Sequence, residues 1–174
     1  SSLYLTPVFI YGFVFRVDMR LRPSGNSGPL ATALTAFSKY QRNEAWTWEH
    51  MALSRARVVA GDPALAAKVT AEVNAVLRLP RDPDKLLFDV ADMRRRIDGE
   101  FPAKTVWSLK YARGGLIDIE FVAQYLQLRY AAERPDILSV DMAESLERAR
   151  EFGLLPADAA ADLLTALRAW RRTQ

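Results

Sequence analysis

An early stretch of the chain alternates between apolar and polar positions. From Gly12 to Arg22, one set of alternate positions is apolar and the other set is mostly charged. A period of two is typical of a β-strand with one buried and one polar face. Pro23 is expected to end this strand, because proline cannot donate a hydrogen bond to a sheet. A glycine-containing loop is expected to follow, over residues 24–29.

The remainder of the chain has apolar residues at helical spacing. Helices are predicted over residues 32–41, 44–60, 64–77, 85–97, 116–132, 142–152 and 157–172. The helix over 116–132 is apolar on most sides and is therefore expected to be central. Gly61 is expected to end the helix before it, and the acidic pair Asp82 and Asp84 is expected to cap a helix start. The predicted fold class is α+β, mostly α: one β piece followed by a helical body.

The amino-acid composition limits which kinds of functional site the chain can contain. The chain has 174 residues, which is enough for one domain or two small ones, and half of them are hydrophobic, so it can bury a core. There is no cysteine and one histidine, His50, so disulfides and thiolate metal sites are excluded and histidine-cluster sites are disfavoured. Carboxylates, arginines and backbone amides remain, and this set suits magnesium and phosphates. The net charge of +3 favours an anionic ligand over bulk nucleic acid, so no nucleic-acid partner is expected.

No segment is predicted to cross or enter a membrane. The chain lacks a run of about 18 apolar residues, the length that a spanning helix needs. Residues 1–10 are apolar but lack a basic start and a small-residue cleavage site, so we expect no signal peptide there.

The predicted strand carries the first candidate site. Asp18 lies two residues from both Arg16 and Arg20, so the three side chains share a face with Arg22. Surface ion pairs in water are one interpretation, and the spacing alone favours it. The other is a metal and phosphate site, in which the carboxylate binds magnesium and the arginines contact phosphate oxygens.

The second candidate stretch is the helix predicted over residues 44–60. Glu49 and Arg57 share one of its faces, and Arg55 lies on a different side with Trp48. The pattern favours a packed helix with its tryptophans in the core and its charges in water. The stretch is nevertheless rich in aromatic and charged residues. His50 is either a base or, as is more usual for a lone helix histidine, simply packed or solvated.

The third candidate stretch begins at Gly114 and Gly115. Two glycines before a helix are expected to leave its amides open to an anion. Asp118 and Glu120 are two residues apart and do not share a helix face. Glu120 instead begins a polar stripe with Gln124 and Gln127, for which a satisfied network between helices is the favoured interpretation.

Together these stretches resemble the bacterial glutamine synthetase adenylyltransferase family. The matching segments are RVDMRLRPSGNSGPL, AWTWEHMALSRARVVAGD and KYARGGLIDIEFVAQYLQL, in this order, and the resemblance runs from about Gly12 to the end. It implies a long cytoplasmic polypeptide with two DNA polymerase β-like nucleotidyltransferase halves, each followed by helices. On this basis residues 1–43 are the end of a nucleotidyltransferase domain, with a remnant of its sheet, and residues 44–174 are the helical domain.

The sequence of the second segment resembles the C-terminal half of the family's polypeptide. The resemblance implies that this half attaches AMP from ATP to a tyrosine of glutamine synthetase. The other half removes AMP by phosphorolysis and typically has an arginine where His50 stands, and it remains the alternative. A further alternative is a non-catalytic helical module that docks glutamine synthetase or a nitrogen-signal regulatory protein.

The resemblance also implies roles for single residues. Asp18 matches the third carboxylate of the superfamily, which binds magnesium and orients the attacking hydroxyl. Arg20 and Arg22 match basic positions expected near the phosphates of ATP. The other motif residues are assigned no chemical role, and we expect them to brace the catalytic domain against the helical one: Glu49, Arg55, Arg57, Gly114, Gly115, Asp118 and Glu120.

The chain departs from the superfamily pattern ahead of Asp18. The family has a Gly-Ser turn and an Asp-x-Asp pair there, whereas residues 1–11 contain no acid and do not resemble the family. Two-metal transfer needs those carboxylates, because one alone cannot hold both ions. We therefore expect the chain to be a fragment that does not transfer AMP on its own.

Overall fold

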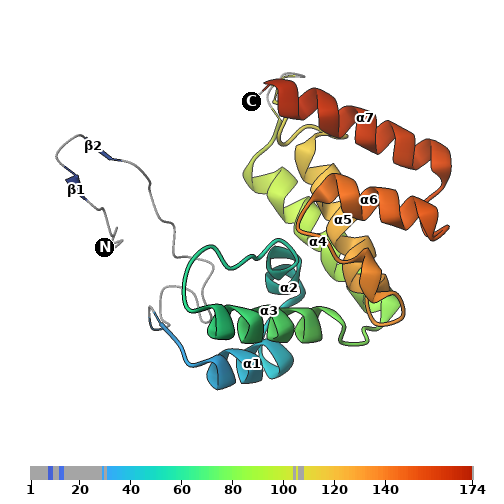
Figure 1. Ribbon diagram of the computed structural model, residues 1–174. Coiled ribbons are helices and arrows are strands. Elements are labelled where there is room, and N and C mark those ends of the chain that lie inside the picture. The colour runs from blue at the N-terminus through green and yellow to red at the C-terminus, as the bar shows by residue number, and fades with distance from the viewer. Residues whose placement is uncertain are drawn as a thin grey trace. The chain divides into compact units, whose positions relative to one another are not determined.

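The computed structural model describes residues 8–9, 12–13, 29, 31–103, 105 and 108–173. Most of these residues lie in helices (Figure 1), so the prediction of a mostly helical chain is confirmed. The chain divides into two compact units, residues 1–45 and 46–174.

The first unit contains two short strands and one helix in its described residues. Strand β1 (Val8–Phe9) pairs antiparallel with strand β2 (Gly12–Phe13), with Val8 opposite Phe13. Helix α1 covers Leu34–Asn43, about two residues beyond the predicted 32–41. The predicted strand over residues 12–22 continues past β2 into residues that the structure does not describe, so the nucleotidyltransferase sheet stays a prediction.

The second unit is helical throughout its described residues. Its elements are α2 (Thr47–Leu53), α3 (Pro63–Leu77), α4 (Pro83–Glu100), α5 (Leu116–Tyr130), the short 3-10 helix η2 (Pro135–Ile137), α6 (Met142–Glu151) and α7 (Ala157–Thr173). Helices α3 to α7 lie within three residues of their predicted bounds, so the periodicity located them correctly.

Aspartates begin three of these helices. The Asp62 side chain accepts a hydrogen bond from the Leu65 N–H at 2.9 Å, and the Asp82 side chain accepts one from the Lys85 N–H at 2.8 Å. Proline follows each of these two aspartates, where its missing N–H costs no helical hydrogen bond. The structural role predicted for Asp82 is thereby confirmed. Asp141 caps α6 in the same way, through the Ala143 N–H.

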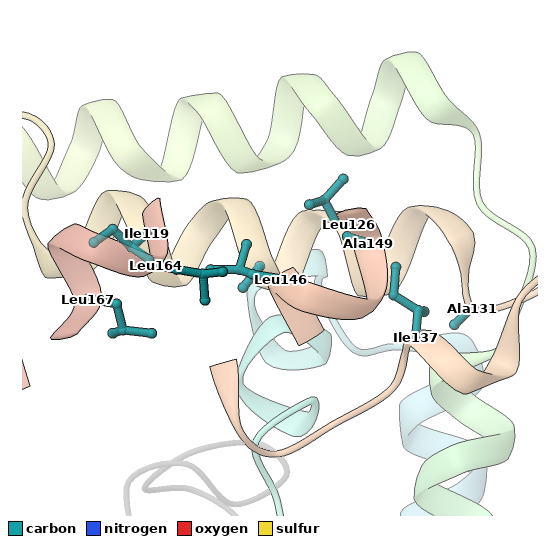
Figure 2. Packing of buried hydrophobic residues seen from close by; sticks show 9 residues of the cluster. Ile119, Leu126, Ala131, Ile137, Leu146, Ala149, Leu164 and Leu167 are labelled. Carbon is teal, nitrogen blue, oxygen red and sulfur yellow. The ribbon is translucent and has the colours of Figure 1, made fainter. Parts of the chain in front are cut away.

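Helix α5 lies at the centre of the second unit, as predicted. It packs against α2, α4, α6, α7 and η2. Figure 2 shows side chains of α5, η2, α6 and α7 converging on one cluster. The cluster consists of buried aliphatic residues: Ile119, Ala123, Leu126, Ala131, Ile137, Leu146, Ala149, Leu164 and Leu167.

The helix predicted over residues 44–60 is much shorter in the structure. Helix α2 ends at Leu53, where the buried Ser54 hydroxyl donates to the Met51 carbonyl at 2.7 Å. Such a local bond competes with continued helix, and the following Val58-Val59 pair is β-branched, which lowers helix propensity. Gly61, with φ of +132°, therefore lies in a loop and does not end a helix.

The two tryptophans of this segment are also not in the core. Trp46 is 71% exposed and Trp48 is 39% exposed. Met51 is instead the hydrophobic residue that α2 buries. The prediction of a tryptophan core was wrong because it assumed that apolar spacing implies burial, although α2 is too short to cover both rings.

Candidate functional site

The described motif residues lie in α2, in the segment directly after it, and at the start of α5 with the turn before it. At its start, the Thr47 hydroxyl donates to Asp89 of α4 at 2.5 Å, and the Lys85 ammonium contacts the same carboxylate at 2.6 Å. Burial alone would raise the pKa of Asp89. The hydrogen bonds from Lys85 and Thr47 and the charge of Lys85 outweigh it, so this pKa lies below its ordinary value. The charged form of Asp89 therefore anchors α2 to α4.

Glu49 stabilises the start of the helix in which it lies. Its carboxylate accepts a hydrogen bond from the Trp46 N–H at 2.8 Å, an arrangement that satisfies an amide at the helix start. Glu49 thus stabilises the first turn of α2.

His50 meets an arginine that sequence reasoning missed. Its Nδ1 lies 3.3 Å from Nη2 of Arg81. Arg81 also donates to carbonyls at the end of α3 and to Leu128 near the end of α5, at 2.8 to 3.4 Å; these carbonyls belong to Val76, Leu77, Leu79 and Leu128. Burial lowers the pKa of Arg81 to about 10. One guanidinium therefore joins α2 to the C-terminal ends of two further helices.

Arg55 links two of the sequence motifs. Its Nη1 lies 2.7 Å from Oε1 of Glu120 on α5, although the two residues are 65 positions apart. The Glu120 side chain is 19% exposed and that of Arg55 is 49% exposed, so the pair lies at the edge of the unit. Arg57 is exposed, and no hydrogen bond or ion pair joins it to the described part of the chain. Arg55 and Glu120 thus join the end of α2 to α5 within the second unit, and their predicted role between the catalytic and helical domains stays a prediction.

The Gly114-Gly115 turn does not leave amides open to an anion. Gly115 N–H donates to Ala112 O at 2.8 Å, and the next two amides donate to Leu109 O and Lys110 O. The Gly114 N–H donates to the Asp118 carboxylate at 2.6 Å. The expectation of an anion site here was therefore wrong, because the preceding loop folds back and supplies the acceptors itself.

The same turn explains why glycine stands at both positions. Gly114 has φ of +74°, in the left-handed region that favours glycine. A Cβ on Gly115 would lie 2.5 Å from Leu109 O and 2.6 Å from Ala112 O. The close approach of two carbonyls thus requires the absence of a side chain at residue 115.

Asp118 binds α4 to this turn. Its carboxylate accepts a short hydrogen bond from Nε of Arg94, and Nη2 of Arg94 reaches the Tyr111 carbonyl at 3.0 Å. The bond to Asp118 raises the pKa of Arg94, and the charge of Asp98 acts in the same direction. Asp118 is therefore committed to internal bonds.

Two of the three residues in the polar stripe of α5, Gln124 and Gln127, are buried. Gln127 is 2% exposed, and its Oε1 accepts a hydrogen bond from the Ser139 N–H at 3.0 Å. Gln124 is buried on the same helix. The satisfied network that the sequence favoured is thus confirmed for Gln127 and for Glu120.

The predicted reaction site lies elsewhere. Asp18, Arg20 and Arg22 are outside the described residues, so their roles stay predictions. Among the described residues, no group of three histidine or acidic side chains could hold a metal ion. None of the helices described is both long and apolar enough to span a membrane. In the described part of the second unit, the motif residues Arg55 and Glu120 pair with each other, and Asp118 binds Gly114 and Arg94.

Comparison with known proteins gives this domain a context. The family model for glutamate-ammonia ligase adenylyltransferase matches residues 5–72, and the one for GlnD PII-uridylyltransferase matches residues 90–174. Three relatives are named bifunctional glutamine synthetase adenylyltransferase/adenylyl-removing enzyme. They come from Bradyrhizobium sp. (53% identical over 84% of this chain), Rhodopseudomonas palustris (52% over 88%) and Xanthobacter autotrophicus (51% over 89%).

The chain belongs to the glutamine synthetase adenylyltransferase family, which the three motifs already resembled. It spans 15% of the length of the first Bradyrhizobium relative and 16% of the Rhodopseudomonas and Xanthobacter relatives.

Proposed function

We propose that this chain is part of an enzyme that transfers AMP from ATP to a tyrosine of glutamine synthetase. The observation that carries the proposal is the identity of about half of the residues, over most of the chain, with relatives named for adenylyl transfer to and removal from glutamine synthetase. His50 supports the adenylyl-transferring half, since the removing half typically has an arginine at this position. An enzyme with these substrates would act in the cytoplasm.

The reaction chemistry would centre on the first unit. The tyrosine hydroxyl would lose its proton as its oxygen attacks the α-phosphorus of ATP. The new P–O bond would form as the bond from that phosphorus to the oxygen of the β-phosphate breaks, and pyrophosphate would leave. Asp18 would orient the tyrosine hydroxyl and serve as one magnesium ligand, while Arg20 and Arg22 would neutralise phosphate charge. Magnesium would supply charge neutralisation when bound. Because no acidic pair precedes Asp18 in this chain, we propose that the 174 residues alone do not transfer AMP.

The second unit would act as the rigid support of that centre. Three contacts support this role: Thr47 with Asp89, His50 with Arg81, and Arg55 with Glu120. They fix α2, which begins directly after the first unit, to three other parts of the helical domain. Catalytic geometry is sensitive to small displacements, so a stiff connection at this position would preserve it.

A chimera tests the proposed function. The segment of the Bradyrhizobium relative that aligns with this chain is replaced by the chain, and labelled AMP incorporation into glutamine synthetase is measured. Asp18→Asn should lower incorporation by roughly a hundredfold or more, because it removes a metal-binding carboxylate. Phosphate-dependent release of ADP from adenylylated glutamine synthetase should be unchanged. Asp162→Asn, on an exposed position of α7, is the matched control.

The opposite pattern would assign the chain to the other half. If Asp18→Asn abolishes the phosphate-dependent release and leaves AMP incorporation intact, the adenylyl-transferring assignment is wrong. AMP incorporation by the 174-residue chain alone would contradict the proposal that it lacks the necessary carboxylates.

A nitrogen-signal regulatory protein is a further proposed partner of the whole enzyme. Its support is the resemblance of the three motifs to a family regulated in that way. Binding of such a protein to the 174-residue chain, measured against the chimera, would place its site inside or outside this segment.

A further inference from the structure

The buried aliphatic cluster around α5 lies in the C-terminal part of the chain. Its members all fall between Ile119 and Leu167 (Figure 2), and the partly buried side chains packed against it lie between Leu116 and Trp170. We call residues 90–174 the C-terminal segment. It contains this cluster together with the apolar side chains that surround it, as expected of a unit that carries its own hydrophobic core.

The C-terminal segment is also the part of the chain that the PII-uridylyltransferase family model matches, whereas the adenylyltransferase family model matches residues 5–72. The names of the two families give different acceptor proteins, glutamate-ammonia ligase and PII. Selection between two acceptors requires surfaces that differ between the enzymes. A segment shared by both families is therefore expected to serve a step common to the two reactions and not to select the acceptor.

Most of the polar contacts that fix α2 do not require particular side chains from the C-terminal segment. Thr47 and Asp89 both precede this segment, as do His50 and Arg81. Arg81 reaches the segment only through the carbonyl of Leu128, at 3.4 Å. A backbone carbonyl is supplied by any residue. These contacts can therefore persist when the sequence of the C-terminal segment changes.

The Arg55–Glu120 pair, by contrast, requires a carboxylate at one position of the C-terminal segment. Arg55 follows the end of α2, and Glu120 lies near the start of α5, with 2.7 Å between Nη1 and Oε1. The nearby acid Asp118 binds Gly114 and Arg94, which both belong to the C-terminal segment itself. Glu120 thus joins the C-terminal segment to α2, while Asp118 holds that segment together.

We propose that the C-terminal segment is a scaffold that can be exchanged between enzymes that transfer nucleotides to different proteins, and that Glu120 is the residue through which this scaffold positions α2. Glu120 acts through Arg55 and is therefore a positioning residue. Under the proposed function the reaction that it supports is AMP transfer to glutamine synthetase, and to that extent the inference rests on that proposal.

An exchange of segments tests the inference in the chimera described above. Its residues 90–174 are replaced by the aligned segment of a PII-uridylyltransferase, with glutamate in one version and glutamine in the other at the position of Glu120. The glutamate version should transfer AMP to glutamine synthetase within about tenfold of the parent chimera, since a displacement of roughly 1 Å would already cost about a hundredfold. It should transfer none to PII. The glutamine version should be about fivefold slower, the limit for a partly exposed ion pair.

Charge reversal in the parent chimera tests Glu120 separately. Arg55→Glu places two carboxylates together and should lower kcat by about fivefold or more, whereas Arg55→Glu combined with Glu120→Arg should recover most of the loss. The KM for glutamine synthetase should stay unchanged in both, because a positioning residue does not bind the acceptor. Glu147→Gln, at an exposed position of α6, is the matched control and should leave kcat unchanged.

The reciprocal exchange completes the test. A PII-uridylyltransferase that carries residues 90–174 of this chain should keep UMP transfer to PII and gain none to glutamine synthetase. Transfer to the other acceptor in either exchange would overturn the inference, and so would loss of transfer in both, whether by misfolding or by misplacement. Equal kcat in the glutamate and glutamine versions, with no recovery on charge reversal, would remove Glu120 from it. A parent chimera without AMP incorporation would instead contradict the proposed function.

Discussion

The two sides of the helical domain are held together in different ways. Helices α5, α6 and α7 share a cluster of buried aliphatic side chains, most of them less than 2% exposed. Helix α2 buries Met51 as its hydrophobic residue and is fixed by three polar contacts to other elements. Apolar burial tolerates small shifts, whereas hydrogen bonds between charged groups fix direction as well as distance. The polar side of the domain therefore specifies orientation, and the apolar side supplies stability.

The largest expected effect lies in the apolar cluster. Leu146→Ala should lower the free energy of unfolding by about 2 to 5 kcal/mol, because Leu146 is fully buried and its loss leaves a cavity. Urea unfolding followed by circular dichroism measures the change. The matched control is Leu87→Ala on α4, where the side chain is 53% exposed and a much smaller loss is expected. Equal losses for the two variants would contradict the assignment of stability to the cluster.

Among the polar contacts that fix α2, we expect replacement of Arg81 to lower the free energy of unfolding most. Arg81→Ala removes the donor from four carbonyls and from His50, so we expect a loss of about 2 kcal/mol or more in unfolding free energy. Arg81→Lys should recover only part of this, because an ammonium cannot match the fork of the guanidinium. Full recovery in the lysine variant would show that charge alone is needed here and not the geometry.

Gly115→Ala tests the close approach in the turn before α5. The added Cβ would meet two backbone carbonyls at 2.5 and 2.6 Å, so the turn must shift, at a cost of about 1 to 3 kcal/mol. Gly99→Ala is the control, since a Cβ there has no neighbour within 4 Å and the residue lies inside α4. That variant should be neutral or slightly stabilising, because alanine favours helix. Thermal unfolding of both variants gives the comparison.

The Arg55–Glu120 pair should contribute less to stability than to orientation. It is partly exposed, so a double-mutant cycle with Arg55→Ala and Glu120→Ala should give a coupling energy of about 1 kcal/mol or less. In the chimera, the same variants should lower AMP incorporation, because they release the end of α2 from α5. A coupling energy of several kcal/mol would instead make the pair a main stabilising contact.

The smallest expected effect is the pH dependence of stability that Asp89 contributes. The pKa of Asp89 is lowered in the folded state, so its contribution to stability is present above its ordinary value of 3.8 and is lost as the pH falls toward the folded pKa. Asp89→Asn should therefore reduce stability at pH 7 and flatten the loss of stability below about pH 4. Denaturant midpoints between pH 3 and 7 measure it. An unchanged slope in that window would mean that Asp89 does not anchor α2 through its charge.

The hydrophobic periodicity of the sequence predicted the helices that form the apolar core, but it did not predict the polar contacts that fix α2. The stripe of Leu86 and Val90 and the apolar surface of the helix over 116–132 report burial directly, so α4 and α5 were located correctly. Asp82 was also predictable, because an aspartate before proline caps a helix by local geometry.

The remaining features depend on partners far away in the sequence. The apolar pattern continues past Ser54, so it could not show that α2 ends there or that Trp46 is exposed. Arg81 lies between two prolines with no periodic signal, and its acceptors include Leu128, 47 positions away. The amides after Gly114 looked free because their acceptors lie in an irregular loop whose path the sequence does not determine.

The position of Arg81 has a consequence for how the domain opens. Its guanidinium donates hydrogen bonds to the carbonyls of Val76 and Leu77 at the C-terminal end of α3. It also donates to the Leu128 carbonyl in the last turn of α5. Fraying of either helix end would expose carbonyls of both, so neither end can loosen by itself without loss to the other. Arg81 thereby links the two helix ends, and we expect amide exchange at both ends to become faster together in Arg81→Ala.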